Sequence, residues 1–326
     1  MTIIASVTGG TGFIGRHLVT HLVEHGVRVR VLTRRPELMR GLWPTEQVEP
    51  WEGDLTKPET LRGFATNARI IYHLAGENRN ADNFEMVNVT GTKNLLELCR
   101  DQDLEKFVHV SSTGPMGGSR VGLIDESTSC YPRNSYERSK YAGEQIAIDA
   151  FGKFQIPVTV IRPPNVFGEG RPKNGDLWLS WLTAIRGGRF RFFGSGDSVA
   201  NYIYAGDLVG ACLLVAGSDK ATGEVYIVSD SCPLRDFVGA AAEFLGVMMP
   251  RTLPVWFGYA VALCLEMTGK LAHFSPPLTV SRVRALTNRA TYSSEKLCKG
   301  LGFRPAFGWR EGLRRTIEWY KQNKLL

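Results

Sequence analysis

The sequence predicts an α/β fold in which a doubly wound parallel sheet is followed by a smaller, mostly helical C-terminal lobe for a substrate. Three observations lead to this prediction. Short apolar runs rich in β-branched residues alternate with amphipathic helical segments through the first half of the 326-residue chain. A glycine-rich turn joins the first apolar run to the first helical segment, and after residue 231 the pattern is almost wholly helical. Strands alternating with helices are typical of a parallel sheet that is covered on both faces.

The glycine-rich turn is the first informative element. The sequence TGGTGFIG (residues 8–15) lies between the apolar run 3–7 and a helical segment whose apolar positions include Phe13, Ile14, Leu18 and Val19. Glycines let the backbone approach a pyrophosphate, and a helix N-terminus supplies N–H groups and a positive dipole end. The three-glycine pattern alone also fits a flexible loop, but the strand before it and the helix after it predict a dinucleotide-phosphate site.

The remaining elements of the first half follow the same alternation. Further strands are predicted at residues 27–32, 48–52, 70–74, 107–110 and 158–161, and helices at about 57–64, 84–100 and 136–151. Ligands of such sheets bind at the carboxyl ends of the strands.

The pattern changes after Pro163-Pro164, and this change sets the expected domain division. Residues 1–165 are predicted to form a dinucleotide-binding domain, to which about 203–230 return as one helix and one strand. Residues 166–202 and 231–326 are predicted to form the substrate-binding lobe. Its helices are expected at 177–186, 234–245, 255–270, 279–286 and 309–323.

Composition limits the partners. The net charge is +7, but no basic run is interleaved with aromatic residues, so no nucleic-acid partner is expected. The charge suits a phosphate-bearing cofactor or substrate, or an anionic membrane surface. The six cysteines form no C-x-x-C pair and no secretory signal is visible, so we expect reduced thiols and a cytoplasmic location.

One segment, Leu253 to Met267, is apolar on most sides. It is only 15 residues long and contains Glu266, and a membrane-spanning helix needs about 20 residues. A buried helix, a peripheral membrane contact and an apolar wall for a substrate all remain open for it.

Tyr136 and Lys140 form the strongest candidate for catalysis. They are four residues apart and share a helix face, and an ammonium beside a phenol favours the phenolate. Ser111, Ser112 and Thr113 follow a predicted strand, where a hydroxyl could hydrogen-bond a substrate oxygen. A Tyr-x-x-x-Lys pair alone is common on exposed helices, but its place after the glycine turn and the hydroxyl cluster predicts a catalytic tyrosine.

The end of the second predicted strand indicates which dinucleotide binds. An acidic residue there would bond the ribose 2′-hydroxyl of NAD, but this chain has Thr33, Arg34 and Arg35. Two guanidiniums suit a 2′-phosphate, so NADP is favoured over NAD. The alternative is that Arg34 and Arg35 are simply exposed and bind no phosphate.

His17, His21 and His25 recur every four residues on the first predicted helix. No carboxylate or cysteine completes a ligand set beside them, so no metal site is predicted.

Taken together, the motifs resemble the extended short-chain dehydrogenase/reductase family over nearly the whole chain. In addition to the glycine turn, the resemblance rests on GDL (53–55), HLAG (73–76), NVTGT (88–92), VSST (110–113), YERSK (136–140), RPPNVFGEG (162–170) and YIYAGDLV (202–209). It implies a Rossmann-type fold. It also implies a homodimer formed through two helices of each subunit, for which the helix from Phe84 and the helix carrying Tyr136 are candidates.

The resemblance implies roles for individual residues. In the family the tyrosine is the acid/base, the lysine lowers its pKa and holds the nicotinamide ribose, and a serine or threonine positions the substrate oxygen. These roles fall on Tyr136, Lys140 and Thr113, with Ser112 as the competing choice. The predicted cofactor-binding residues, from the glycine turn, the arginine pair and the resemblance together, are Gly9, Thr11, Gly12, Phe13, Ile14, Gly15, Arg34, Arg35, Asp54, Leu55, Leu74, Ala75, Gly76, Ser111, Tyr136, Lys140, Pro163, Asn165 and Val166.

The reaction is predicted from the C-terminal region. Segments 253–266, 276–279, 290–293, 301–305 and 311–313 resemble the 3β-hydroxysteroid and sterol-carboxylate dehydrogenase branch. Gly117-Gly118 stands where many relatives have a Tyr-Gly pair whose tyrosine often helps to handle a sugar. We therefore expect an NAD(P)-dependent oxidoreductase that transfers hydride at a secondary alcohol or ketone of a small molecule, sterol-like or isoprenoid-like.

Two alternatives stay open. The first is a nucleotide-sugar 4-epimerase or dehydratase with tightly bound NAD, in which Arg171, Arg186, Arg189 and Arg191 could surround a diphosphate. The second is a non-catalytic NADP-binding scaffold, against which the intact set of Thr113, Tyr136 and Lys140 argues.

Overall fold

The computed structural model describes residues 5–117, 121–170, 177–194, 196–272, 276 and 278–326. Its centre is a seven-stranded sheet in the order β12-β7-β5-β4-β1-β2-β3, in which every neighbouring pair is parallel. The strands are β1 (Ala5–Thr8), β2 (Val29–Thr33), β3 (Val48–Glu52), β4 (Ile70–His73), β5 (Lys106–Val110), β7 (Val158–Arg162) and β12 (Val225–Ile227). The predicted doubly wound parallel sheet is confirmed.

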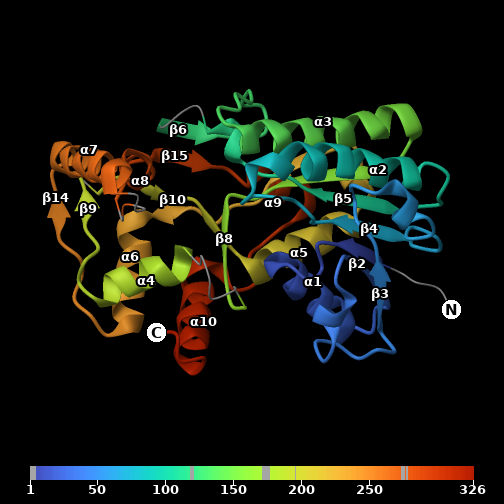
Figure 1. Cartoon of the computed structure of the whole chain (residues 1–326), viewed down its shortest axis with the longest axis horizontal. Helices are drawn as coiled ribbons and strands as arrows, with labels where there is room; N and C mark the ends of the chain where they lie inside the picture. Colours follow the sequence, from blue (N-terminus) through green and yellow to red (C-terminus); the bar gives the residue numbers. More distant parts are fainter. Residues whose placement is uncertain (1–4, 118–120, 171–176, 195, 273–275, 277) are drawn as a thin grey trace.

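Helices cover both faces of this sheet (Figure 1). On one face lie α1 (Phe13–Glu24) and α5 (Ala205–Ala216), and on the other lie α2 (Gly91–Cys99) and α3 (Ser135–Phe154). The apolar positions of α1, Leu18 and Val19, are fully buried, as are Leu95 of α2 and Ala147 of α3. Burying one such leucine or valine contributes about 1.5–3 kcal/mol, so both layers are held by side chains that the helical periodicity predicts.

Two predicted helices differ in the structure. The segment expected as a helix at 57–64 is only a 3₁₀ turn, Pro58–Leu61. The Thr60 hydroxyl accepts the Asp54 N–H at 2.9 Å, and this hydrogen bond stabilises a tight turn in place of a longer helix. The segment expected as one helix from residue 84 begins with a π-helical stretch, Glu85–Thr90, before α2. This stretch brings the Asn88 carbonyl so close to α3 that a Cβ at Gly143 would lie 2.2 Å from its oxygen.

The C-terminal half builds the second lobe, at the end of the molecule away from β3 (Figure 1). Phe167, Trp178 and Phe237 form the centre of an aromatic core there. The helices are α4 (Leu177–Arg186), α6 (Leu234–Leu245), α7 (Val255–Ala272), α8 (Val280–Leu286), α9 (Glu295–Leu301) and α10 (Gly308–Gln322); α9 was not predicted. The division of the chain into two domains stays a prediction, although α5 and β12 do lie on the sheet.

In the described part of the chain, four two-stranded pairs connect distant segments. β8 (Asn165–Phe167) pairs with β11 (Tyr202–Tyr204), β9 (Phe192–Phe193) with β14 (Thr252–Leu253), β10 (Val199–Ala200) with β13 (Cys232–Pro233), and β6 (Val121–Ile124) with β15 (Arg289–Tyr292). The β6–β15 pair was not predicted, because short strands that are far apart in sequence leave no periodic signal.

The apolar helix α7 is half-buried. Ala262 packs against Phe193 and Val283, whereas Trp256 is 70% exposed and Met267 is 67% exposed. In the part of the chain that the structure describes, no helix has both the length and the apolar character needed to cross a membrane. Because Trp256 and Met267 are exposed, the interpretation of this segment as a buried helix is wrong.

Candidate functional site

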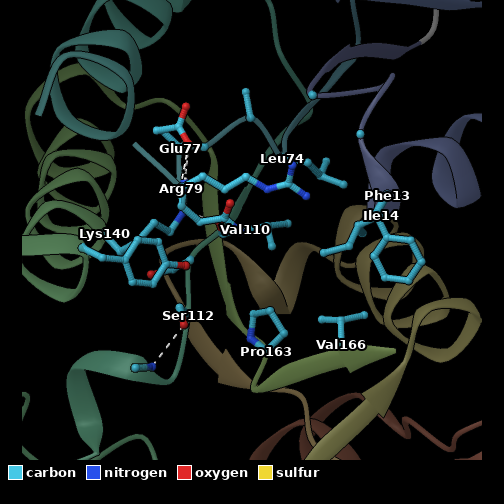
Figure 2. Close-up of a pocket in the computed structure, with 18 of the residues that line it drawn as sticks. Phe13, Ile14, Leu74, Glu77, Arg79, Val110, Ser112, Lys140, Pro163 and Val166 are labelled. Atoms are coloured by element: carbon cyan, nitrogen blue, oxygen red, sulfur yellow. Dashed lines mark hydrogen bonds between the residues drawn. The ribbon is translucent and has the colours of Figure 1, made fainter. Parts of the chain in front are cut away.

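A cleft of about 1520 Å³ runs along the carboxyl ends of the sheet strands and into the second lobe. Every residue that the sequence analysis singled out for catalysis or cofactor binding lines it. Figure 2 shows Phe13, Ile14 and Val166 on one side of the cleft and Lys140 and Ser112 on the other. The structure therefore brings the predicted residues together, while their individual roles stay predictions.

The glycine turn between β1 and α1 has no room for side chains. A Cβ at Gly15 would lie 2.1 Å from the Gly9 carbonyl oxygen, and Gly9 itself has a φ of +72° with the Ala75 nitrogen 2.7 Å from its ideal Cβ. The Gly12 N–H donates to the Gly9 carbonyl at 2.9 Å, which closes the turn. Gly10, which was not singled out, is equally constrained, because its Cβ would lie 2.7 Å from a Val31 methyl.

The start of α1 suits an anion. No side chain caps it, and its first turn holds no acidic residue. The first N–H groups of a helix need partners, and a pyrophosphate supplies them while meeting the positive dipole end. The closed glycine turn and the uncapped helix together fit the diphosphate of a dinucleotide.

Tyr136 lies in the first turn of α3. Asn134 caps this helix, because its Oδ1 accepts the Glu137 N–H at 2.8 Å. The ring packs edge-on against Phe84, with 5.6 Å between ring centroids. The phenol is therefore held in one orientation at the wall of the cleft.

The pKa of Tyr136 is raised, whereas its spacing from Lys140 predicted a lowered value. Burial is the main cause; a hydrogen bond with Ser112 acts in the opposite direction, and the charge of Glu137 adds to the rise. The Lys140 ammonium points elsewhere, since its Nζ donates to the Val110 carbonyl at 2.9 Å. In this state Tyr136 is a protonated phenol at neutral pH, which is the form that donates a proton.

Lys140 is buried, and burial lowers the pKa of its ammonium to about 8, although the charge of Glu144 opposes the change. His73 and His109 lie beneath it on β4 and β5. Burial and the charge of Lys140 lower the pKa of both rings, that of His73 to about 3. The histidines are therefore neutral at pH 7, where Lys140 still carries its proton.

Lys140 should make the stability of the protein depend on pH. Below pH 8 the lysine is protonated in both folded and unfolded chains; between pH 8 and its ordinary value of 10.5 only the unfolded chain keeps the proton. The free energy of unfolding of the wild type should therefore rise with pH across this window relative to Lys140→Met, by about 3 kcal/mol in total. Urea unfolding at pH 7 to 11 without dinucleotide measures it, with Lys93→Met, at an exposed lysine, as control. A constant difference between wild type and Lys140→Met would contradict the lowered pKa.

The two candidate hydroxyls make different contacts. Ser112 bonds with Tyr136, and its Oγ accepts the Gly114 N–H at 3.1 Å. Thr113 is 4% exposed, lines the cleft and bonds with the hydroxyl of Tyr292. Ser112 thus contacts the phenol of Tyr136 directly, whereas Thr113 contacts Tyr292 of β15.

The arginine pair lies at the other end of the cleft. Arg34 and Arg35 are both exposed and line it. Arg79, which the sequence analysis missed, extends across the cleft toward Leu74 (Figure 2). Its neighbour Glu77 accepts the N–H groups of residues 78–80 and lies close enough to Arg34 to interact with its charge. The one sequence signal for Arg79 is its place in a loop that follows a predicted strand.

Other missed residues come from the C-terminal third and from beneath the site. Ser281, Arg284 and Asn288, in and after α8, line the cleft, as does Tyr292 of β15. Beneath the site, Arg162 and Glu144 form a bidentate ion pair with N–O distances of 3.0 and 2.5 Å. Arg162 and Tyr292 lie in segments that carry the resemblance, 162–170 and 290–293, but the sequence does not show that they lie in or beneath the site.

Several expected features lie elsewhere. Arg186, Arg189 and Arg191 are not among the residues that line the cleft, and Arg171 lies outside the described residues. The first-helix histidines contact backbone, His17 at the Glu169 carbonyl (2.9 Å) and His25 at the His21 carbonyl (2.8 Å). α7 does not line the cleft; α8, which packs on it, does.

The chain is similar to known proteins. Residues 5–229 match the model of a family described as the NAD dependent epimerase/dehydratase family. A 3β-hydroxysteroid-dehydrogenase/decarboxylase of Arabidopsis thaliana is 29% identical over 98% of this chain and 80% of its own length. A human dTDP-D-glucose 4,6-dehydratase is 28% identical over 97% of this chain and 89% of its own length.

Solved structures share the fold. A dTDP-glucose 4,6-dehydratase from Bacillus anthracis, in complex with NAD, superposes with a TM-score of 0.76 over 99% of this chain and 98% of that chain, at 21% identity. At this identity the likeness shows the fold alone.

Proposed function

The chain belongs to the NAD dependent epimerase/dehydratase family, a family of enzymes that use a nicotinamide dinucleotide, and we propose that it transfers hydride at a secondary alcohol or ketone of a sterol-like or isoprenoid-like molecule. One observation carries the proposal: Tyr136, Ser112 and Lys140 lie together in the same cleft as the glycine turn.

Tyr136 would move the proton in this reaction. In the reduction direction the protonated phenol gives its proton to the carbonyl oxygen. In the oxidation direction the phenol first loses its own proton to solvent, and the phenolate then takes the proton of the substrate hydroxyl. Ser112 hydrogen-bonds the phenol and stabilises charge that develops on it, and Thr113 faces the substrate side of the same cleft. The bound dinucleotide would accept or donate the hydride.

Two features support a lipid-like substrate over a nucleotide sugar. The described arginines expected around a sugar diphosphate do not line the cleft. Ala285 and Leu286 of α8 line it beside the polar Ser281 and Arg284 of the same helix, and the Arabidopsis relative is a 3β-hydroxysteroid-dehydrogenase/decarboxylase by name. The alternative, a nucleotide-sugar dehydratase, rests on the human relative at almost the same identity.

The test begins with the dinucleotide. Freshly purified protein is denatured, and any released dinucleotide is identified by mass spectrometry. An empty site, together with steady formation of NAD(P)H from a 3β-hydroxysteroid such as dehydroepiandrosterone, is the expected result. Tightly held NAD without net NAD(P)H turnover would overturn the proposal in favour of internal hydride return.

We propose NADP as the preferred dinucleotide. Arg34 and Arg35 are exposed on the cleft wall after β2, where a 2′-phosphate would meet them. Arg34→Ala should weaken NADPH binding by about 10- to 100-fold and NADH binding much less, because it removes a charge-assisted hydrogen bond to the phosphate. Titration of both dinucleotides measures this, and Arg40→Ala, an exposed arginine outside the cleft, is the control. Equal losses for NADPH and NADH would exclude Arg34 as a phosphate ligand.

We also propose a homodimer through α2 and α3. These helices pack on each other over one face of the sheet, and Leu98, Ile146 and Ile148 on them are only partly buried (Figure 1). Sedimentation velocity should show a dimer that Ile146→Glu dissociates; a monomeric wild type would exclude it.

A peripheral membrane contact through Leu253 to Met267 is proposed for a cytoplasmic enzyme with a lipid-like substrate. Large apolar side chains of α7, at the outer end of the second lobe (Figure 1), are exposed; among them are Trp256, Phe257, Leu263 and Met267. Co-sedimentation with phosphatidylserine-containing vesicles should fall in Trp256→Ser but not in Leu177→Ser, at an equally exposed site on α4. Equal retention of both variants would exclude α7 as the contact. Cell fractionation tests the proposed cytoplasmic location. Recovery of the enzyme from another compartment would exclude it.

A further inference from the structure

His73 lies at the end of β4, beside the end of β1, and both of its ring nitrogens have a partner. The parallel register pairs His73 with Thr8, the last residue of β1, and both side chains are buried. The Nδ1 of His73 lies 2.7 Å from the Thr8 Oγ1, and its Nε2 lies 2.9 Å from the Thr92 Oγ1 of α2. A hydroxyl can donate or accept, so the direction of each bond depends on the other partners of the two threonines.

The partners of Thr8 fix the direction at one end. The Thr8 hydroxyl accepts the Ala75 N–H at 3.3 Å, and an N–H can only donate. In the part of the chain that the structure describes, this hydroxyl has no partner other than Ala75 and His73. The Thr8 proton therefore goes to the Nδ1 of His73, because the opposite direction would leave a buried hydroxyl proton without an acceptor.

The partners of Thr92 give the same direction at the other end. Thr92 donates its single hydroxyl proton to the Asn88 carbonyl at 2.8 Å, a bond to the preceding helical turn that threonines often make. Its oxygen can therefore only accept from the Nε2 of His73. Burial lowers the pKa of His73 to about 3, so the ring is neutral and has one proton. Both ends place that proton on Nε2 and leave Nδ1 as an acceptor.

The loop after β4 is held by these bonds, and it lies against the glycine turn. The nitrogen of Ala75 is 2.7 Å from the position that a Cβ of Gly9 would occupy. The corresponding position at Gly76 is 3.7 Å from the Lys140 Nζ. Leu74, Ala75 and Gly76 all line the cleft. A shift of this loop would therefore change the wall against which the dinucleotide is predicted to bind.

We propose that His73 is a positioning residue for the dinucleotide: its Nδ1 takes the Thr8 proton and so turns the lone pairs of the Thr8 oxygen toward the Ala75 N–H, which fixes the loop 74–76 against the glycine turn. His73 is not among the residues that line the cleft, so it acts only through Thr8 and Ala75. The inference rests on the dinucleotide site of the proposed function and makes no demand on the substrate.

Binding titrations with NADPH and NADH test the position of the loop. His73→Leu is similar in size but cannot accept the Thr8 proton, so both Kd values should rise by about 3- to 10-fold, the range of one neutral hydrogen bond. His73→Asn places an amide oxygen near the position of Nδ1 and should recover most of the affinity.

His109→Leu is the matched control. The His109 ring is buried on the neighbouring strand with its centroid 5.2 Å from that of His73, and within the described residues neither of its nitrogens has a hydrogen-bond partner. This variant should leave both Kd values unchanged. Equal losses in His73→Leu and His109→Leu would overturn the inference, as would no loss in either. Equal losses in His73→Leu and His73→Asn would overturn the acceptor role of Nδ1.

The ring proton gives a second readout, which needs no dinucleotide and no folded His73→Leu. In wild type labelled with nitrogen-15 histidine, the His73 signals are those that His73→Asn lacks, and two-bond couplings identify the protonated nitrogen. A proton on Nε2 at neutral pH is expected, and a proton on Nδ1 would overturn the inference. Neither readout uses a steroid, so a wild type that binds dinucleotide but oxidises no steroid ends the proposed function alone. A wild type that binds neither dinucleotide overturns the inference as well.

Discussion

Tyr136→Phe is expected to lower kcat by about 10²- to 10⁴-fold, the range that a positioned acid/base supplies, while the dinucleotide Kd changes little. The variant loses only the hydroxyl that moves the proton. The ring remains packed on Phe84 and the glycine turn is untouched. Initial rates with dehydroepiandrosterone and binding titrations with NADPH and NADH measure the two quantities separately.

A second tyrosine of the same helix provides the control. Tyr141 lies five residues farther along α3 and does not line the cleft, so Tyr141→Phe should keep wild-type turnover. Full activity in Tyr136→Phe would remove the acid/base role. A large loss of dinucleotide affinity in that variant would make Tyr136 a binding residue instead.

The largest effect on stability is expected from Glu144→Ala. Its carboxylate pairs with Arg162 at N–O distances of 2.5 and 3.0 Å, and the two side chains are 1% and 8% exposed. Removing one partner leaves the guanidinium buried without its counter-charge, which costs about 3–5 kcal/mol. Urea unfolding with two spectroscopic probes measures the loss and checks that the transition is a single step.

Two further variants separate charge from packing. Glu144→Leu combined with Arg162→Met removes both charges and should recover most of the stability that Glu144→Ala loses. Glu243→Ala breaks the exposed pair with Arg310 and should change the free energy of unfolding by less than about 1 kcal/mol. A loss in Glu144→Ala no larger than that in Glu243→Ala would mean that the buried pair contributes little.

The sheet and the cofactor end of the cleft could be predicted because their signals are local. A glycine turn such as 8–15 has a strand on one side and a helix on the other, so its whole pattern is visible in one short stretch of sequence, although Ala75 and Val31 also crowd it in the fold. Tyr136 and Lys140 are likewise one helical turn apart. The structure brings all these residues into one cleft.

The substrate end could not be predicted in the same way. Tyr292 faces Thr113 only because β15 pairs with β6, and neither strand is long enough to have a periodic signature. The pKa of Tyr136 was predicted in the wrong direction for a similar reason. Spacing indicates that Lys140 is near, but not that its ammonium bonds the Val110 carbonyl or how deeply the phenol is buried.

The parallel pair of β6 and β15 also sets the order in which the site is completed during synthesis. About 180 residues separate Thr113 from Tyr292, and at about 5–20 residues per second their translation takes about 10–40 s. From the synthesis of Lys140 until that of Val280 the growing chain has the glycine turn, Tyr136 and Lys140, but neither α8 nor Tyr292. The nascent protein therefore carries the residues predicted to bind the dinucleotide well before it carries α8 and β15 at the other end of the cleft.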